Sequence, residues 1–345
     1  MDMADTERLT LRGYTKERFQ GISCAYLDPS DRITTEYDGF ADKELNISVD
    51  ENTIFPACSI SKFVTALCVM KAYELEMIDI DAQINRYLSR WKLRTPDGNE
   101  SSASVRSLLC HTAGIVDGED AFYGLRRDDP VISLTDILDG KTSYNSRPAC
   151  TEKAPGTEFE YSDAGYCVLQ MLLEDLTRKP FEDVTKECIF DPLGLKRTFF
   201  ASLKNVEEYG NNYVMAAGYD ENGMPIPGKY PQVPDLAASG LWSTPKELLV
   251  IAREFIRAYN GKSSLLKESS AHEMARPHEK FPWIGLGVFM GGENEVISRG
   301  WGENGQSILK INYNTGEAAV VMTNQNPGVD QSESGIEAIA DRKRG

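Results

Sequence analysis

The sequence predicts an α/β (α+β) protein with a central antiparallel sheet that is built from both ends of the chain and flanked by helices. Three observations predict this fold class. Apolar and polar residues alternate near the amino terminus, apolar residues recur every three to four positions through the middle, and alternation returns in the last third. Strands at both ends need a common sheet, so we expect residues 1–75 and 206–345 to form one discontinuous sheet domain around a mostly helical region of residues 76–205.

Two strands and two helices are indicated in the first half of the chain. The alternation of residues 21–27 and 33–37 predicts two strands, because a polar turn over residues 28–31 can join them. Apolar residues then fall on one helical face from residue 59 to about residue 77, and again, most clearly, over residues 164–177.

A further helix begins at Pro245. Thr244 precedes it as the N-cap and Glu247 completes the capping pattern, in which side chains satisfy the free amide groups of the first turn. Apolar runs then indicate three more strands, and an amphipathic tail indicates a last helix. These elements cover residues 284–288, 307–311, 318–322 and 332–342.

The charge balance excludes some classes of partner. The chain has 345 residues, with 37 Lys and Arg against 53 Asp and Glu, which gives a net charge of −16. Binding to nucleic acid needs clustered cations, so we expect no nucleic acid partner. No run approaches the ~20 apolar residues of a membrane helix, so we expect no membrane association.

The cysteines and the amino terminus bear on the cellular compartment. Seven cysteines are scattered without CxxC spacing, mostly inside apolar runs, and there are three histidines, so we expect free thiols and no metal site. Residues 1–8 carry no basic region, no apolar core and no small-residue cleavage site. We therefore expect a cytoplasmic protein without a signal peptide.

The pattern Ser59-x-x-Lys62 is the first candidate for chemistry. A separation of three places both side chains on one face of a helix, and Pro56 just upstream predicts that Ser59 lies in its first turn. The free amide groups and the positive dipole end at this place favour an oxyanion and disfavour a second cation. A lysine desolvated there can lose its proton near neutral pH and act as a base toward serine, although the pattern alone is common in helices.

Two loop segments add further candidates. Tyr161 lies in residues 155–166, which lead into the clearest helix, and a phenol beside a lysine can have its pKa lowered and shuttle protons. Residues 299–305 are rich in glycine and precede a predicted strand, so they can let a substrate approach closely and offer free amide groups to an oxyanion. The simpler interpretations are that Tyr161 is a half-buried aromatic side chain and that residues 299–305 form a plain hairpin turn.

These segments carry a resemblance to the penicillin-recognising serine hydrolases, in the branch with class C β-lactamases, D-aminopeptidases and related esterases. Six blocks occur in family order from about Gly21 to Asn326, so the resemblance covers nearly the whole chain as a single catalytic unit. The blocks are residues 53–62, 108–114, 155–166, 189–195, 240–244 and 321–324.

The resemblance implies a role for each matching residue. Ser59 resembles the family's nucleophile, Lys62 the base or electrostatic partner that activates it, and Tyr161 the tyrosine that relays protons. His111 resembles the histidine of a turn found in the family and is expected to be structural. No metal and no organic cofactor are implied.

The sequence departs from the family pattern in the block that contains Tyr161. The family's Asn is replaced by Asp163, which loses two amide donors and adds a negative charge beside Lys62. This charge should hold Lys62 protonated more firmly and weaken binding of a substrate amide carbonyl. We therefore expect the chain to resemble the esterases more than a true β-lactamase.

A second departure concerns the glycine-rich segment. The family's Lys-Thr-Gly or His-x-Gly motif reads Arg299-Gly300-Trp301, in which Arg299 keeps a cation that could hold a substrate carboxylate. A register shifted to Trp301-Gly302 would instead leave Arg299 outside the pocket. The oxyanion hole is expected to combine the Ser59 amide with one near Trp301 or Gly302.

The function that the resemblance implies is a serine hydrolase that forms an acyl-enzyme on Ser59 and transfers the acyl group to water. We expect a small ester, amide or short peptide as the substrate, with D-amino acids or slow β-lactam turnover among the options. The alternatives are a binding or regulatory scaffold without turnover, a cell-wall D,D-peptidase, which would require export, and an acyltransferase that uses an alcohol or amine in place of water.

Overall fold

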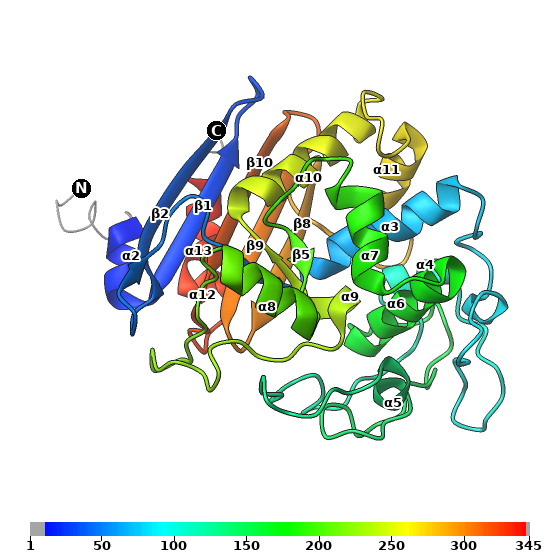
Figure 1. The fold of residues 1–345 in the computed structure, drawn as a ribbon. Helices are drawn as coiled ribbons and strands as arrows, with labels where there is room; N and C mark the ends of the chain where they lie inside the picture. Colours follow the sequence, from blue (N-terminus) through cyan, green and yellow to red (C-terminus); the bar gives the residue numbers. More distant parts are fainter. Residues whose placement is uncertain (1–10, 343–345) are drawn as a thin grey trace.

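A seven-stranded antiparallel sheet forms the centre of the molecule. The computed structural model describes residues 11–342. The strands are β1 (Gly21–Leu27), β2 (Ile33–Asp42), β3 (Ile47–Ser48), β7 (Phe289–Met290), β8 (Glu295–Gly302), β9 (Gly305–Asn312) and β10 (Glu317–Thr323). They lie in the order β3-β2-β1-β10-β9-β8-β7, so that β1 pairs with β10 and the two ends of the chain share one sheet (Figure 1). The predicted fold class is confirmed.

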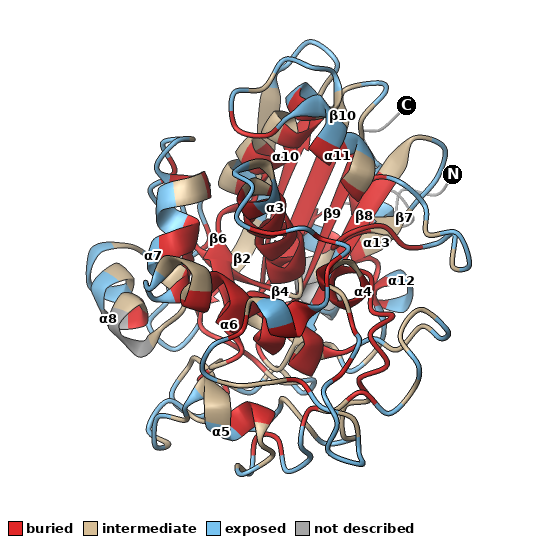
Figure 2. Cartoon of the chain, turned by 90° about the vertical axis from the view of Figure 1, so that its right-hand side faces the viewer, coloured by how far each residue is buried: buried red, intermediate tan, exposed pale blue. Residues whose placement is uncertain are grey.

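Both faces of the sheet are buried at β1, so its alternate side chains enter two different cores. On β1, Ile22 and Tyr26 pack into a core shared with α13 (Ile336–Asp341), whereas Ala25 and Leu27 pack into the larger core shared with α10 (Pro245–Tyr259). Figure 2 shows the buried strands between these helices. Burial of each large apolar side chain stabilises the fold by roughly 1.5–3 kcal/mol.

Helices and connecting segments occupy the rest of the chain. Between residues 76 and 205, short helices alternate with long connections, and the division into two domains stays a prediction. The helices outside the tail are α2 (Leu11–Glu17), α3 (Ser61–Glu74), η1 (Ile84–Arg86), α4 (Val105–Leu109), α5 (Leu134–Leu138), α6 (Asp163–Thr177), α7 (Phe181–Thr185), η2 (Lys186–Phe190), α8 (Leu203–Asn212), α9 (Leu236–Ser239), α10 and α11 (Glu268–Met274). Helices α3, α6 and α9 contact one another beside the main sheet.

A second, smaller sheet was not predicted from the sequence. Its strands are β4 (Phe55–Cys58), β5 (Phe199–Phe200) and β6 (Leu241–Ser243), in the order β4-β6-β5. Each has only two to four residues, which is too short for an alternating pattern to be recognised. Because β4 also contacts β8 and β9, it fixes the chain that leads to Ser59 against the main sheet.

The prediction of a strand over residues 284–288 is wrong. Gly287 has a left-handed backbone (φ +72°), and a Cβ at this position would lie 2.3 Å from the side chain of Ala66. The amide groups of Leu286 and Gly287 donate to the carbonyls of Met274 and Leu109, which belong to helical segments. These residues therefore pack the chain against helices, and β7 begins only at Phe289.

The tail helix and one helix cap also differ from expectation. The tail forms two short helices, α12 (Gln331–Ser334) and α13, because Gly335 between them has φ +91°. Thr244 caps α10 as predicted, since its side chain accepts a hydrogen bond from the Glu247 amide. The Glu247 carboxylate, however, accepts hydrogen bonds from the amides of Lys196 and Arg197, so it ties a neighbouring loop to α10 in place of completing a reciprocal cap.

The described residues also bear on the compartment and membrane predictions. Among residues 11–342, no helix combines the length and apolar character needed to cross a bilayer. All seven cysteines are free thiols. Residues 1–8, on which the prediction about a signal peptide depends, lie outside the described residues.

Candidate active site

Ser59 lies in a tight turn between β4 and α3. Cys58, directly before it, has a left-handed backbone (φ +48°), which is costly for a residue with a side chain and is typical of positions that the surrounding fold constrains. The Ile60 amide donates to the Ala57 carbonyl and closes the turn. Helix α3 begins at Ser61, so Ser59 lies just outside the helix and not in its first turn as predicted, whereas Lys62 does lie in that turn.

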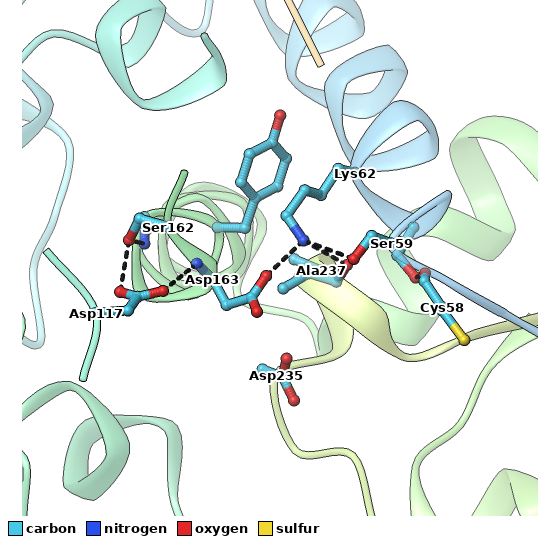
Figure 3. Close-up of polar contacts among 12 residues, drawn as sticks. Cys58, Ser59, Lys62, Asp117, Ser162, Asp163, Asp235 and Ala237 are labelled. Carbon is cyan, nitrogen blue, oxygen red and sulfur yellow. Dashed lines mark hydrogen bonds and ion pairs between the residues drawn. The ribbon is translucent and has the colours of Figure 1, made fainter. Parts of the chain in front are cut away.

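The Lys62 amine is surrounded by three hydrogen-bond acceptors. It donates to Ser59 Oγ at 3.2 Å, to Asp163 Oδ1 at 2.5 Å and to the Ala238 carbonyl at 3.0 Å (Figure 3). Its side chain is only 4% exposed. Three acceptors match the three N–H groups of an ammonium ion, so this environment suits the protonated lysine.

The charges around Lys62 also favour its protonated form. Burial alone lowers the pKa of Lys62, but the Asp163 carboxylate and the Tyr161 phenol outweigh it and leave the pKa raised. The prediction that desolvation makes Lys62 a neutral base is therefore wrong for the resting protein. The prediction that Asp163 holds Lys62 protonated is confirmed.

Tyr161 closes over this pair from the loop before α6. Its ring stacks on His111 with 4.3 Å between ring centroids, and Lys62 Nζ lies 4.8 Å from the tyrosine ring. Although the residue is 40% exposed, desolvation by the surrounding groups raises the pKa of the phenol, while the charge of Lys62 and hydrogen bonding to Lys62 and Ser59 lower it by less. The predicted lowering of this pKa is thus wrong, and the resting phenol keeps its proton.

His111 fixes the loop that carries Tyr161. The imidazole is buried, and its Nδ1 accepts a hydrogen bond from the Ser162 amide at 3.1 Å. Burial and the nearby charge of Lys62 hold the pKa of His111 well below its usual range. A neutral imidazole with an accepting Nδ1 is therefore the form that this hydrogen bond requires.

Two carboxyl groups that no sequence motif marked flank Asp163, namely the partly buried Asp117 and the buried Asp235. Asp117 accepts hydrogen bonds from Ser162 Oγ at 2.8 Å and from the Asp163 amide at 2.5 Å, and so fixes the start of α6 (Figure 3). Asp235 accepts one from the Tyr144 hydroxyl at 2.5 Å. Burial and the charge of Asp163 raise the pKa of Asp117 to about 6 and that of Asp235 to about 7. Neither aspartate belongs to a recognisable motif, so no sequence signal marked them.

The end of β8 runs directly beside the Ser59 turn. A Cβ at Gly300 would lie 2.3 Å from the Ala57 carbonyl, so only glycine lets β8 approach β4 this closely. The segment that was predicted to precede a strand is itself strand up to Gly302. Ser298, two residues before Gly300 and on the same face, borders a small hollow with Ser59 and was not singled out from the sequence.

The Trp301 amide faces away from the sheet. Gly302 pairs with Gly305 across a two-residue turn, which makes them a hydrogen-bonded pair, and amide directions alternate along a strand. The Trp301 amide therefore points away from β9, at a place where β7, which pairs only with the beginning of β8, does not reach. The Ser59 amide donates to none of the described residues. Both residues line the same cleft, so two amides are available there.

A cleft of about 830 Å³ opens in front of Ser59 and continues past Trp301 to α12 and α13. Its lining is rich in aromatic side chains, namely Phe122, Tyr123, Tyr144, Tyr161, Phe289 and Trp301. Arg299 also borders the cleft, but its side chain lies on the face of β8 opposite Gly300 and pairs with Glu337 at 2.8 Å. Within residues 11–342, no group of three or more His, Cys, Asp or Glu side chains is placed to hold a metal ion.

The fold and the arrangement around Ser59 define a β-lactamase-like protein. The chain belongs to the Beta-lactamase family, whose model matches residues 7–343. The resemblance to penicillin-recognising serine hydrolases is thereby confirmed at the level of the family.

Individual relatives include proteins with several names. The chain is similar to esterase EstB of Burkholderia gladioli, with 28% identity over 170 residues, which cover 48% of this chain and 43% of that protein. It thus spans less than half the length of this curated relative. Among solved structures, a penicillin-binding protein homologue from Pyrococcus abyssi matches with a TM-score of 0.79 at 23% identity, covering 99% of this chain and 77% of that one. The D-amino acid amidase from Ochrobactrum anthropi SV3 matches with a TM-score of 0.75 at 22% identity, covering 96% of each chain.

Proposed function

We propose that the protein is a serine hydrolase that forms an acyl-enzyme on Ser59 and hydrolyses small esters or amides. The observation that carries this proposal is the contact of the Lys62 ammonium with Ser59 Oγ at 3.2 Å, with the Tyr161 phenol beside both groups. The relatives named as an esterase and an amidase support the same substrate classes.

In this proposal Lys62 relays a proton and does not act as a free base. As Ser59 Oγ attacks the substrate carbonyl, its proton passes to Lys62, which can accept it only by giving one of its own protons to Asp163, 2.5 Å away. The amides of Ser59 and Trp301 then hold the oxyanion that forms. The Lys62 ammonium also stabilises the developing negative charge on Ser59 Oγ.

Tyr161 is proposed to deliver the proton to the leaving group. The raised phenol pKa means that the proton is present when the tetrahedral intermediate collapses, and the proton held by Lys62 and Asp163 restores the phenol afterwards. Over acylation the net movement is one proton from Ser59 to the leaving alcohol or amine. Water then attacks the acyl-enzyme by the reverse route.

A panel of substrates compared between the wild type and Ser59→Ala tests this proposal. We expect the wild type to hydrolyse short-chain nitrophenyl esters or D-amino acid amides, and nitrocefin slowly at most. The variant should lose at least about 10³-fold in kcat/KM, since it keeps only the oxyanion and binding contributions. Full activity of Ser59→Ala would refute the role of Ser59 as the nucleophile. No hydrolysis of any of these substrates by the wild type would refute the proposal and favour a scaffold without turnover.

A further inference from the structure

Most of the charged side chains that line the cleft are carboxylates, and the single guanidinium among them is already in an ion pair. Its lining contains the carboxylates of Asp163, Glu303, Asp330 and Glu337 and one guanidinium, that of Arg299. Asp163 is paired with Lys62, and Glu303 with Arg126. No cation of residues 11–342 lies within ion-pair distance of Asp330, whose pKa is lowered by hydrogen bonds from Ser332 and the Glu333 amide.

Arg299 is the one cation among the described residues that line the cleft, and it is held by Glu337. The two side chains are 40% and 26% exposed and lie 2.8 Å apart, so the pair stands at the wall of the cleft. Arg299 also borders the small hollow that Ser59, Lys62 and Ser298 line. A guanidinium in this position could otherwise bind a substrate carboxylate. Its charge is neutralised by a residue of α13, 38 positions later in the chain.

The face of β8 next to Ser59 offers no replacement cation. The residues that point to this side are Ser298 and Gly300, of which one carries a neutral hydroxyl and the other no side chain. A substrate carboxylate near the scissile bond would therefore find no free cation on this face, and the Asp330 carboxylate, which has no cationic partner among residues 11–342, would repel it across the cleft.

We propose that Glu337 is a specificity-determining residue: by pairing with Arg299 it makes the cleft select neutral or cationic substrates and reject substrates with a carboxylate beside the scissile bond. This inference rests on the proposed function and specifies its substrate class. The uncompensated negative charge comes from Asp330, since Glu337 is itself neutralised by Arg299, while the aromatic lining favours apolar substituents. The prediction from sequence that Arg299 holds a substrate carboxylate is replaced by this proposal.

A matched pair of substrates tests the proposal. 4-Nitrophenyl butyrate and 4-nitrophenyl hydrogen succinate have the same leaving group and acyl chains of similar length, but the succinate carries a carboxylate. For the wild type we expect kcat/KM to be at least tenfold higher with the butyrate. Because exposed charges are screened by salt, this ratio should fall as the ionic strength rises from about 0.02 M to about 0.5 M.

Glu337→Gln releases Arg299 while Lys310, the other partner of Glu337, keeps its ion pair with Asp341. We expect this variant to lower the butyrate-to-succinate ratio of kcat/KM at least threefold. Glu337→Gln combined with Arg299→Gln should raise this ratio again. Glu51→Gln, which removes the same charge from a surface pair with Lys246, should leave the wild-type ratio unchanged.

Three results would overturn the inference, and they differ in what they imply for the proposed function. Equal rates for both esters in the wild type, or a ratio that Glu337→Gln does not change, would refute the role of Glu337 while hydrolysis of the butyrate upholds the proposed function. Failure of the wild type to hydrolyse the butyrate at all would refute the proposed function and this inference with it.

Discussion

Replacing Asp163 with asparagine changes the charge next to Lys62 while keeping the shape of the side chain. In the wild type the carboxylate lies 2.5 Å from Lys62 Nζ and raises the pKa of that amine against the effect of burial. The amide removes the larger of the two effects that oppose burial and leaves only that of Tyr161, so the pKa of Lys62 should fall. Asp163→Asn therefore converts Lys62 from a permanent ammonium into a group that titrates in the accessible pH range.

The structure gives the expected size and sign of the effect. The two side chains are only 4% and 23% exposed, so the pair is buried, and removing one partner of such a pair costs about 3–5 kcal/mol. We take the lower end, about 3 kcal/mol at pH 7, because the introduced amide can still accept a hydrogen bond and Lys62 can lose its proton. In the wild type the raised pKa of Lys62 keeps this contribution constant at every pH below the unfolded pKa of lysine. In the variant a lysine with a lowered pKa destabilises the fold as long as it is charged, so the cost should be largest below the new pKa of Lys62 and should shrink as the pH rises through it.

Two assays check this prediction. Denaturant unfolding at pH 7 should show the loss in unfolding free energy, and the loss should shrink as the pH is raised toward 10. The kcat/KM of the variant should rise with pH through the new pKa of Lys62, whereas the wild-type profile shows no such limb because its lysine stays protonated. An unchanged profile together with unchanged stability would refute the assignment of Lys62 as an ammonium held by Asp163.

Three further predictions follow from other contacts in the site. Tyr161→Phe should lower kcat by about 10²–10⁴ without preventing fluorophosphonate labelling of Ser59, since the variant lacks only the proton donor; an unaffected kcat would exclude Tyr161 from proton delivery. Gly300→Ala should destabilise the fold by about 1–3 kcal/mol and reduce kcat/KM, because its Cβ would meet the Ala57 carbonyl at 2.3 Å; Gly292→Ala, with nothing within 4 Å, is the control, and equal effects would contradict the packing argument. His111 is held neutral, so its contribution to stability is present above about pH 6.5 and is lost as the pH falls toward 5; His111→Gln should remove this slope from the unfolding free energy, and a variant with the wild-type slope would contradict the neutral imidazole.

The fold was predictable because its elements leave periodic patterns that local sequence can show. The pairing of β1 with β10 follows from strand patterns at both ends of the chain, and α6 follows from apolar spacing. The prediction that was wrong also has a physical reason. Residues 284–288 have the composition of a strand, but the close approach of Gly287 to Ala66 packs them against helix α3.

The candidate site was predictable only where its residues form motifs. Ser59, Lys62 and Tyr161 were identified by spacing and by family resemblance, and the structure brings all three together. The ionisation of Lys62 depends on contacts between distant segments, and Asp117 belongs to no motif, so neither followed from helix geometry alone.

Pairs formed across long sequence separations were beyond local reasoning. Arg299 was assigned to substrate binding because it keeps a cation where the resembling family's Lys-Thr-Gly or His-x-Gly motif is expected. Its actual partner, Glu337, becomes adjacent only when α13 packs on the sheet. The pairing of Gly302 with Gly305, which sets the direction of the Trp301 amide, likewise joins β8 to β9, while the alignment of residues 299–302 with the family motif stays a prediction.

Acyl transfer to the Ser59 hydroxyl can be observed directly by mixing the protein with excess 4-nitrophenyl butyrate, quenching in acid within one turnover and measuring the intact mass. We expect the mass to increase by one butyryl group, located by peptide mapping on the segment that contains Ser59 and absent from Ser59→Ala. A butyryl group on another residue, or one that persists in Ser59→Ala, would contradict the covalent mechanism.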